Sequence, residues 1–175
     1  MAGVQAKGLR VVAQNAYAAV GTFENIGVAI WKTATTIDLV RVVGSTLQTL
    51  AQEHERGIGL IQVIGETHPA LSSDVHRELQ KMLVGASANL RCSTVVFEGQ
   101  GFRAAAVRSV VTGLAMLARL PFPHHIFATV PIAVEWELAH LKRIAPDLKR
   151  DEVIRAIEGL RARTNVPDLA MAAGP

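Results

Sequence analysis

The spacing of the hydrophobic residues changes after about residue 35, and this change constrains the fold more than any other feature of the sequence. Before it, short segments rich in Val, Ile and aromatic residues are separated by Asn, Gly or Glu, which is typical of strands joined by tight turns. These segments span residues 9–15, 17–23 and 26–32. From Thr36, which can cap a helix, apolar residues recur every three or four positions as far as Leu50, the spacing of an amphipathic helix. The chain therefore opens with strands and then changes to a helical pattern.

Helices and strands alternate through the rest of the chain. Nearly continuous apolar runs of strand length occupy residues 58–65, 92–99 and 126–130. Helical spacing follows at residues 74–90, 102–119 and 131–143, and again at 147–163. Alternation of this kind predicts an α/β fold with a mixed, mostly parallel central sheet, antiparallel opening strands and helices packed on it. We divide the chain into an α/β domain at 1–145 and a C-terminal helix and tail at 146–175.

The amino-acid composition argues against some classes of function. Half of the residues are hydrophobic, and 18 Lys and Arg against 15 Asp and Glu leave a net charge of only +3 without a dense basic block. Nucleic-acid binding needs clustered cations, so we do not expect it. The single cysteine, Cys92, excludes an internal disulfide and an all-thiolate metal site, and its strand position predicts a buried, inert thiol.

No segment of the sequence has the pattern of a membrane span or a secretion signal. The longest apolar stretch, residues 104–120, is interrupted by Arg108 and Arg119, so we interpret it as a buried helix. The first residues lack an apolar run followed by a cleavage site of small residues. We therefore expect a cytoplasmic protein.

The order of elements over residues 9–143 resembles that of the STAS domains (sulfate transporter and anti-sigma-factor antagonist), in particular their SpoIIAA-like (STAS/SEC14-like) branch. Supporting stretches are the strand "IGLIQVIG", which runs into a serine-bearing loop and helix, and "VVFEGQGFRAAAVRSVVTGL", which enters the third helix. The resemblance implies a small regulatory or binding module without a cofactor. In the partner-switching members a serine or threonine at the start of the second helix is phosphorylated, and the corresponding positions here are Ser72 and Ser73. The stretch "PALSSDVH" departs from the family's turn, because it has neither the preceding Asp nor the following Gly.

Ser72 and Ser73 have two interpretations. A phosphate at either position would be stabilised by the start of the helix and would change the charge presented to a partner. Alternatively, the hydroxyl simply caps the helix by accepting a backbone N–H.

The stretch 99–104 fits the pattern G-x-G-x-x-A between a strand and a helix. Dinucleotide binding also needs an acidic residue about 20 positions further on, and none is present there. Gly99, Gly101, Arg103 and Arg108 are therefore candidates for contact with an anion or an acidic partner. The alternative is a tight turn in which the glycines allow close packing.

His68 and His76 flank one loop and form the best histidine cluster, although a metal site needs three or four converging ligands. The sequence contains no Gly-x-Ser-x-Gly elbow, and we expect no catalytic residues and no metal or other cofactor. The leading hypothesis is a non-enzymatic cytoplasmic module that binds a partner protein, with a homodimer as one form. The alternatives are a carrier for an apolar or anionic small molecule and an enzyme built on the loop of His68 and His76.

Overall fold

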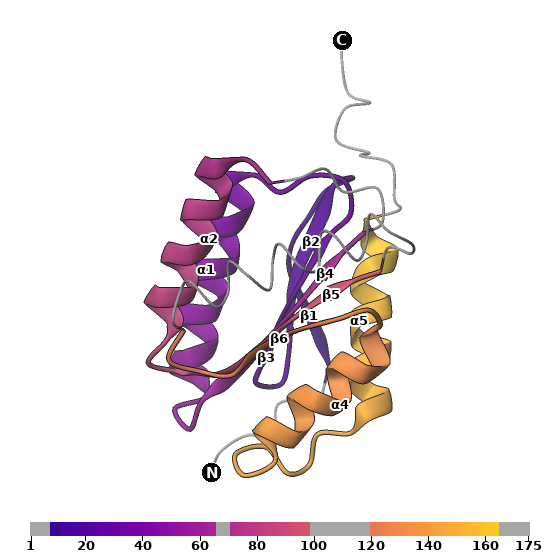
Figure 1. Ribbon diagram of the computed structural model, residues 1–175. Helices are drawn as coiled ribbons and strands as arrows, with labels where there is room; N and C mark the ends of the chain where they lie inside the picture. Colours follow the sequence, from indigo (N-terminus) through magenta and orange to yellow (C-terminus); the bar gives the residue numbers. More distant parts are fainter. Residues whose placement is uncertain (1–7, 66–70, 99–119, 165–175) are drawn as a thin grey trace.

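A six-stranded mixed sheet forms the centre of the protein, whose structure is a computed structural model that describes residues 8–65, 71–98 and 120–164 (Figure 1). The strands lie in sequence order, β1-β2-β3-β4-β5-β6. β1, β2 and β3 pair antiparallel, whereas β3, β4, β5 and β6 pair parallel. The α/β class, the antiparallel opening strands and the parallel remainder are thus confirmed.

The strands differ in burial according to their place in the sheet. β1, at one edge, alternates between exposed and half-buried side chains, as a strand with one solvated face does. β2 and β3 are buried along their whole length, and β4 and β5 nearly so, because helices cover both faces of the sheet. The strand bounds are β1 Leu9–Gln14, β2 Ala18–Phe23, β3 Ile26–Trp31, β4 Ile58–Ile64, β5 Leu90–Phe97 and β6 His124–Phe127.

The described part of the chain contains four helices: α1 Ile37–Glu53, α2 Ser73–Ala86, α4 Val130–Leu141 and α5 Arg150–Arg163. Thr36 caps α1, because its side chain accepts the N–H of Leu39. Pro131 lies in the first turn of α4, where its missing N–H would have no helical partner in any case. The helix starts therefore follow local signals in the sequence.

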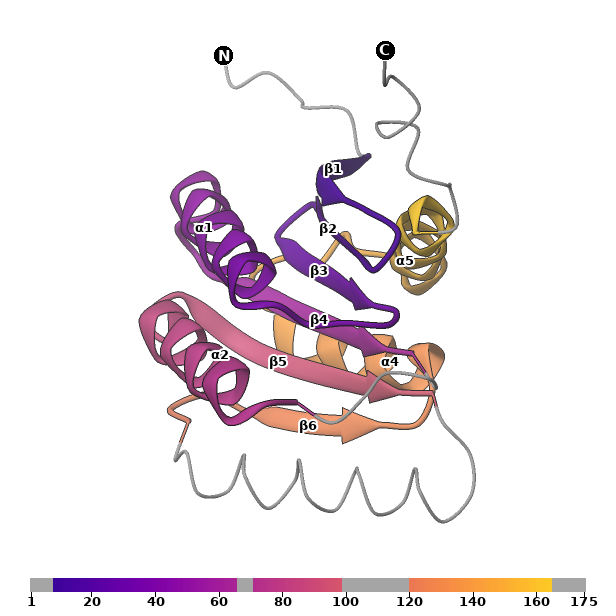
Figure 2. The ribbon, with the colours of Figure 1, turned by 90° about the horizontal axis from the view of Figure 1, so that it is seen from above.

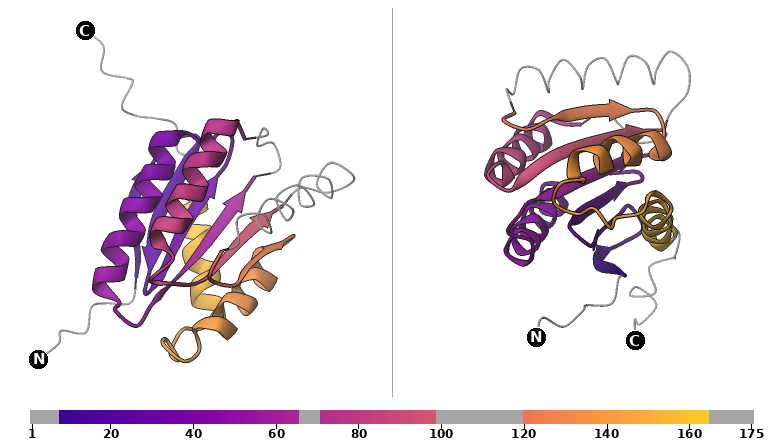
Figure 3. Two further views of the ribbon diagram at one scale, coloured as in Figure 1. Left: turned by 60° about the vertical axis from the view of Figure 1, so that its left-hand side comes forward. Right: turned by 90° about the horizontal axis from the view of Figure 1, so that it is seen from below.

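The helices form two layers, one on each face of the sheet. α1 and α2 lie side by side on one face, and α4 and α5 cover the other (Figure 2). α5 packs over β1–β3, while α4 packs over β4–β6 (Figure 3). Each layer encloses a separate hydrophobic core, which includes Trp31 and Leu47 on the first face and Phe23 and Ile157 on the second. Burial of this apolar area supplies the main stabilisation of the fold.

Several predicted boundaries were wrong by a few residues. α2 ends at Ala86 rather than at Leu90, because Leu90 already pairs with Ile58 as the first residue of β5. β6 begins at His124 and ends at Phe127, since Thr129 and Val130 start α4. The predicted helix at 102–119 lies outside the described residues. Within residues 8–65, 71–98 and 120–164, we find no helix with the length and apolar character needed to cross a membrane.

Candidate functional site

Ser72 and Ser73 are exposed at the start of α2. This helix begins at the end of the sheet where the parallel strands finish (Figure 1). The Ser72 hydroxyl accepts the N–H of Val75 at 3.3 Å, so this residue is the cap of the helix. Ser73 is the first residue inside the helix. Arg77 lies one turn further on and pairs with Asp74 at 3.0 Å. The capping interpretation is thus confirmed for Ser72, and modification of either serine stays a prediction.

The end of the sheet where the parallel strands finish is linked by side-chain hydrogen bonds to the C-terminal end of α5. Glu98, directly after β5, accepts two hydrogen bonds from the guanidinium of Arg161, one of them 2.8 Å long. Lys32, directly after β3, donates to the carbonyl of Thr164 at 3.3 Å. A cation at this position also interacts favourably with the helix dipole. The carboxyl ends of β3 and β5 are therefore joined through one helix.

The other predicted site residues are distributed as follows. His76 is half-buried on α2, and His68 lies outside the described residues. Gly99, Gly101, Arg103 and Arg108 lie outside them as well. In the part of the chain that the structure describes, no three His, Cys, Asp or Glu side chains are grouped so that they would hold a metal ion.

Glu137 is a carboxyl group buried completely between α4 and the sheet, with 0% of its surface exposed. Its Oε1 accepts the backbone N–H of Leu60 at 2.9 Å, whereas Oε2 has no hydrogen-bond partner. The space exists because residue 59 is glycine, and a Cβ there would lie 2.4 Å from Oε1. Burial raises the pKa of Glu137 to about 8, so this side chain is a neutral acid at pH 7.

Two polar side chains of β5 face Glu137. The Cys92 thiol donates a weak hydrogen bond to the backbone carbonyl of Glu137, with 3.9 Å between the two atoms. Burial raises the pKa of this thiol, and so does the negative charge that Glu137 carries once it is ionised at higher pH. Thr94 lies on the same face, and its buried hydroxyl has no hydrogen-bond partner. The predicted burial of Cys92 is confirmed, and a protonated thiol without access to solvent is a poor nucleophile.

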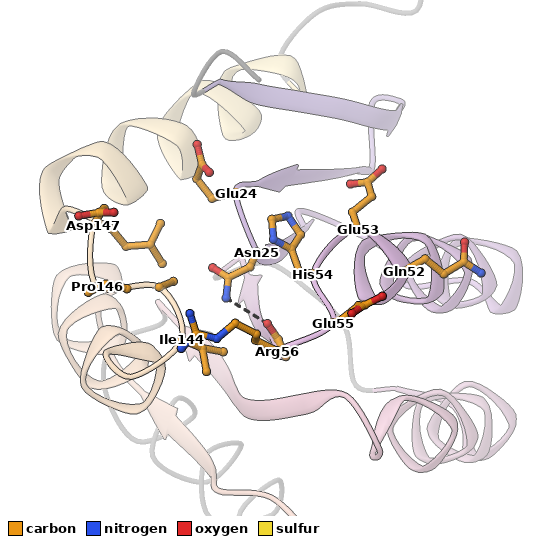
Figure 4. Close-up of a pocket in the computed structure, with 13 residues that line it drawn as sticks. Glu24, Asn25, Gln52, Glu53, His54, Glu55, Arg56, Ile144, Pro146 and Asp147 are labelled. Atoms are coloured by element: carbon orange, nitrogen blue, oxygen red, sulfur yellow. Dashed lines mark hydrogen bonds between the residues drawn. The ribbon is translucent and has the colours of Figure 1, made fainter. Parts of the chain in front are cut away.

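A pocket of about 630 Å³ opens at the opposite edge, where β3 and β4 begin (Figure 4). Three connections line it: the β2–β3 turn, the α1–β4 loop and the α4–α5 loop. Glu24 in the turn has a φ of 50°, a backbone conformation that is uncommon for residues other than glycine. Next to it, Asn25 is buried, and its Nδ2 donates to the carbonyl of Gly57 at 3.2 Å. The lining mixes polar and apolar residues, and four of the residues that line the pocket are acidic.

Sequence reasoning missed both Glu137 and the pocket. Glu137 could have been found, because it occupies the apolar stripe of α4 formed by Ala133, Val134 and Leu141. The pocket could not, since its lining joins residues 24–25 with residues 52–57 and 144–148, and no local pattern connects them.

Comparisons of this chain with protein-family models, with curated proteins and with solved structures found no match.

Proposed function

We propose that this protein is a non-enzymatic regulatory module that binds a partner protein, with a fold of the STAS type in its SpoIIAA-like branch. Its support is the element order: antiparallel opening strands followed by β3, β4, β5 and β6 as parallel neighbours in sequence order. A second copy of the chain is one form that the partner can take. Charge placed at the start of α2 would control the interaction.

One observation carries the proposal: an exposed serine pair lies where a helix begins at the carboxyl edge of the sheet. Ser73 is the more accessible target, since the Ser72 hydroxyl is already engaged as the cap. A phosphate on Ser73 would lie one turn before Arg77, which currently pairs with Asp74. It would compete for that guanidinium and add negative charge to the surface that the partner meets.

The buried polar groups favour a binding module over an enzyme. Cys92 and Glu137, the two side chains with the most strongly raised pKa values, are both fully buried between α4 and the sheet. A group of this kind cannot reach a substrate unless the core opens. Both faces of the sheet are also occupied by core side chains, which gives no support to a carrier that holds an apolar ligand between sheet and helices.

The test begins with the modification. We would incubate the purified chain with ATP and an extract of the cells that produce it, and then locate any phosphate by intact-mass and peptide analysis. The expected result is one phosphate on the peptide that contains Ser72 and Ser73, absent from the Ser73→Ala variant.

The second arm measures binding. Affinity capture with wild type, Ser73→Ala and Ser73→Asp should recover a partner in amounts that differ severalfold between the Ala and Asp variants. Ser45→Asp is the matched control, because Ser45 is exposed on α1, which precedes α2 on the same face of the sheet. Absence of phosphate together with equal recovery by all variants would contradict the proposal.

A further inference from the structure

The pocket at the amino edge of the parallel strands has the size of a small-molecule site. Its volume of about 630 Å³ falls within the range of roughly 300–1,000 Å³ that is usual for ligand pockets. Figure 4 shows Pro146 and Asp147 of the α4–α5 loop facing Glu53 at the end of α1 and Glu55 of the α1–β4 loop. Asn25 lies between them. Two loops and a turn from distant parts of the chain therefore surround one space.

Asn25 presents an unused acceptor to this space. The residue is only 4% exposed, and its Nδ2 donates to the carbonyl of Gly57, which determines which way the amide faces. Oδ1 has no hydrogen-bond partner and lies on the pocket side of the amide, away from the Gly57 carbonyl (Figure 4), although the atom itself is covered from solvent. A buried carbonyl without a donor is unfavourable, so a ligand N–H that reaches Oδ1 as the lining side chains shift would be stabilised here.

The charges around the pocket are predominantly negative. Four carboxylates line it, and Glu53 alone among them is neutralised, by two hydrogen bonds from Arg10 of 2.9 and 3.0 Å. Within the described residues, Glu24, Glu55 and Asp147 form no ion pair. The one lining guanidinium, Arg56, donates to the carbonyl of Arg143 at 2.8 Å. The pocket thus offers acceptors and negative charge.

We propose that this pocket binds a small organic cation that carries ammonium or guanidinium groups. Such groups consist of N–H donors with a positive charge, which complement both the Asn25 carbonyl and the surrounding carboxylates. A bare metal ion fits less well, because the described residues contain no group of three His, Cys, Asp or Glu side chains close enough to share one ion. The site lies at the opposite edge of the sheet from Ser73, so it is independent of the proposed switch.

Isothermal titration calorimetry with agmatine, which carries one ammonium and one guanidinium group, tests the proposal. We expect saturable one-to-one binding that weakens as salt is added. Succinate and 1,4-butanediol, at the same concentrations, should produce no saturable heat. Equal binding of succinate, absence of agmatine binding at millimolar concentration, or tighter binding of Mg²⁺ at the same residues would overturn the proposal.

Variants locate the site. Glu24→Gln combined with Asp147→Asn keeps the shape of the pocket and removes two charges, and it should weaken agmatine binding about tenfold. Asn25→Ala should weaken binding as well, but it also removes the hydrogen bond to Gly57, so its circular dichroism must match wild type. Glu135→Gln, an exposed carboxyl on α4, is the control and should bind like wild type. Unchanged affinity in the double variant would overturn the assignment, whatever the outcome for Ser73.

Discussion

Replacing Glu137 with glutamine should change how the stability of the protein depends on pH. The amide keeps the size of the side chain and the acceptor for the Leu60 N–H, but it cannot ionise. At low pH the variant should be somewhat less stable than wild type, by about 1 kcal/mol, because its NH₂ group lacks an acceptor where Oε2 has no partner. At high pH the order should reverse.

The magnitude follows from the pKa of the carboxyl in the two states. Burial raises the pKa of Glu137 to about 8 from its ordinary value of 4.5. Above pH 4.5 the unfolded chain ionises this group, whereas the folded chain keeps it protonated. Its contribution to stability is therefore complete below pH 4.5 and is lost as the pH rises toward 8. The slope is about 1.4 kcal/mol per pH unit, which gives a total loss on the order of 4–5 kcal/mol.

His124 acts in the opposite direction over part of the same range. Burial, followed by the neighbouring His125, lowers the pKa of His124 to about 4 from 6.5. Its contribution to stability is thus complete above pH 6.5 and is lost as the pH falls toward 4. We expect wild-type stability to change little between pH 4.5 and 6.5 and to fall between pH 6.5 and 8. The Gln variant retains His124, so subtracting the two curves leaves the effect of Glu137.

Urea unfolding followed by circular dichroism at pH 5, 6, 7, 8 and 9 measures this difference. The free energy of unfolding of wild type minus that of Glu137→Gln should fall by several kcal/mol across the series and change sign. Glu135→Gln, an exposed carboxyl on the same helix, should give a difference that varies by less than about 0.5 kcal/mol. A difference for Glu137→Gln that is constant with pH would refute the argument, because it would mean that the buried carboxyl does not titrate in this range.

Four further substitutions test other parts of the structure. Gly59→Ala should lower the free energy of unfolding by about 1–3 kcal/mol, because its Cβ would lie 2.4 Å from the carboxyl of Glu137. Urea denaturation at pH 5 measures this loss, and a variant as stable as wild type would contradict the prediction. Ser72→Ala should lower the free energy of unfolding by about 1 kcal/mol through loss of the cap, whereas Ser73→Ala should leave it nearly unchanged; equal effects in thermal unfolding would argue against Ser72 as the cap. Glu24→Gly should raise the midpoint of thermal unfolding, because glycine adopts the positive φ without strain, at a gain of about 0.5–1 kcal/mol. The same substitution should weaken agmatine binding. A lower midpoint would show that the turn is not strained.

Much of the architecture could be predicted because it depends on local patterns. The helical spacing that begins at Thr36 and the continuous apolar run at residues 58–65 each identify one element without reference to the rest of the chain. The end of α2 could not be placed in this way. Residues 86–90 continue an acceptable helical pattern, but residues 87–89 form a turn and Leu90 pairs with Ile58 as the first residue of β5.

The candidate sites also differ in whether a local pattern of the sequence identifies them. Ser72 was found because a helix cap is encoded within four residues of sequence. The acceptor of Asn25 was missed, because its environment is made by loops that are far apart in the chain. Glu137 was missed for a different reason: charged residues are expected to be exposed, although its place on the apolar stripe of α4 indicates burial.

The packing of α5 over β1–β3 has a consequence for the synthesis of the protein. These strands leave the ribosome before α5, and Phe23 and Ile26 belong to the core that Ile157 and Leu160 complete. Until α5 emerges, that apolar face is open to water and to other chains. Exposed apolar surface on an incomplete sheet promotes aggregation. We therefore expect nascent chains that stop before residue 150 to expose this apolar face and to be held by chaperones.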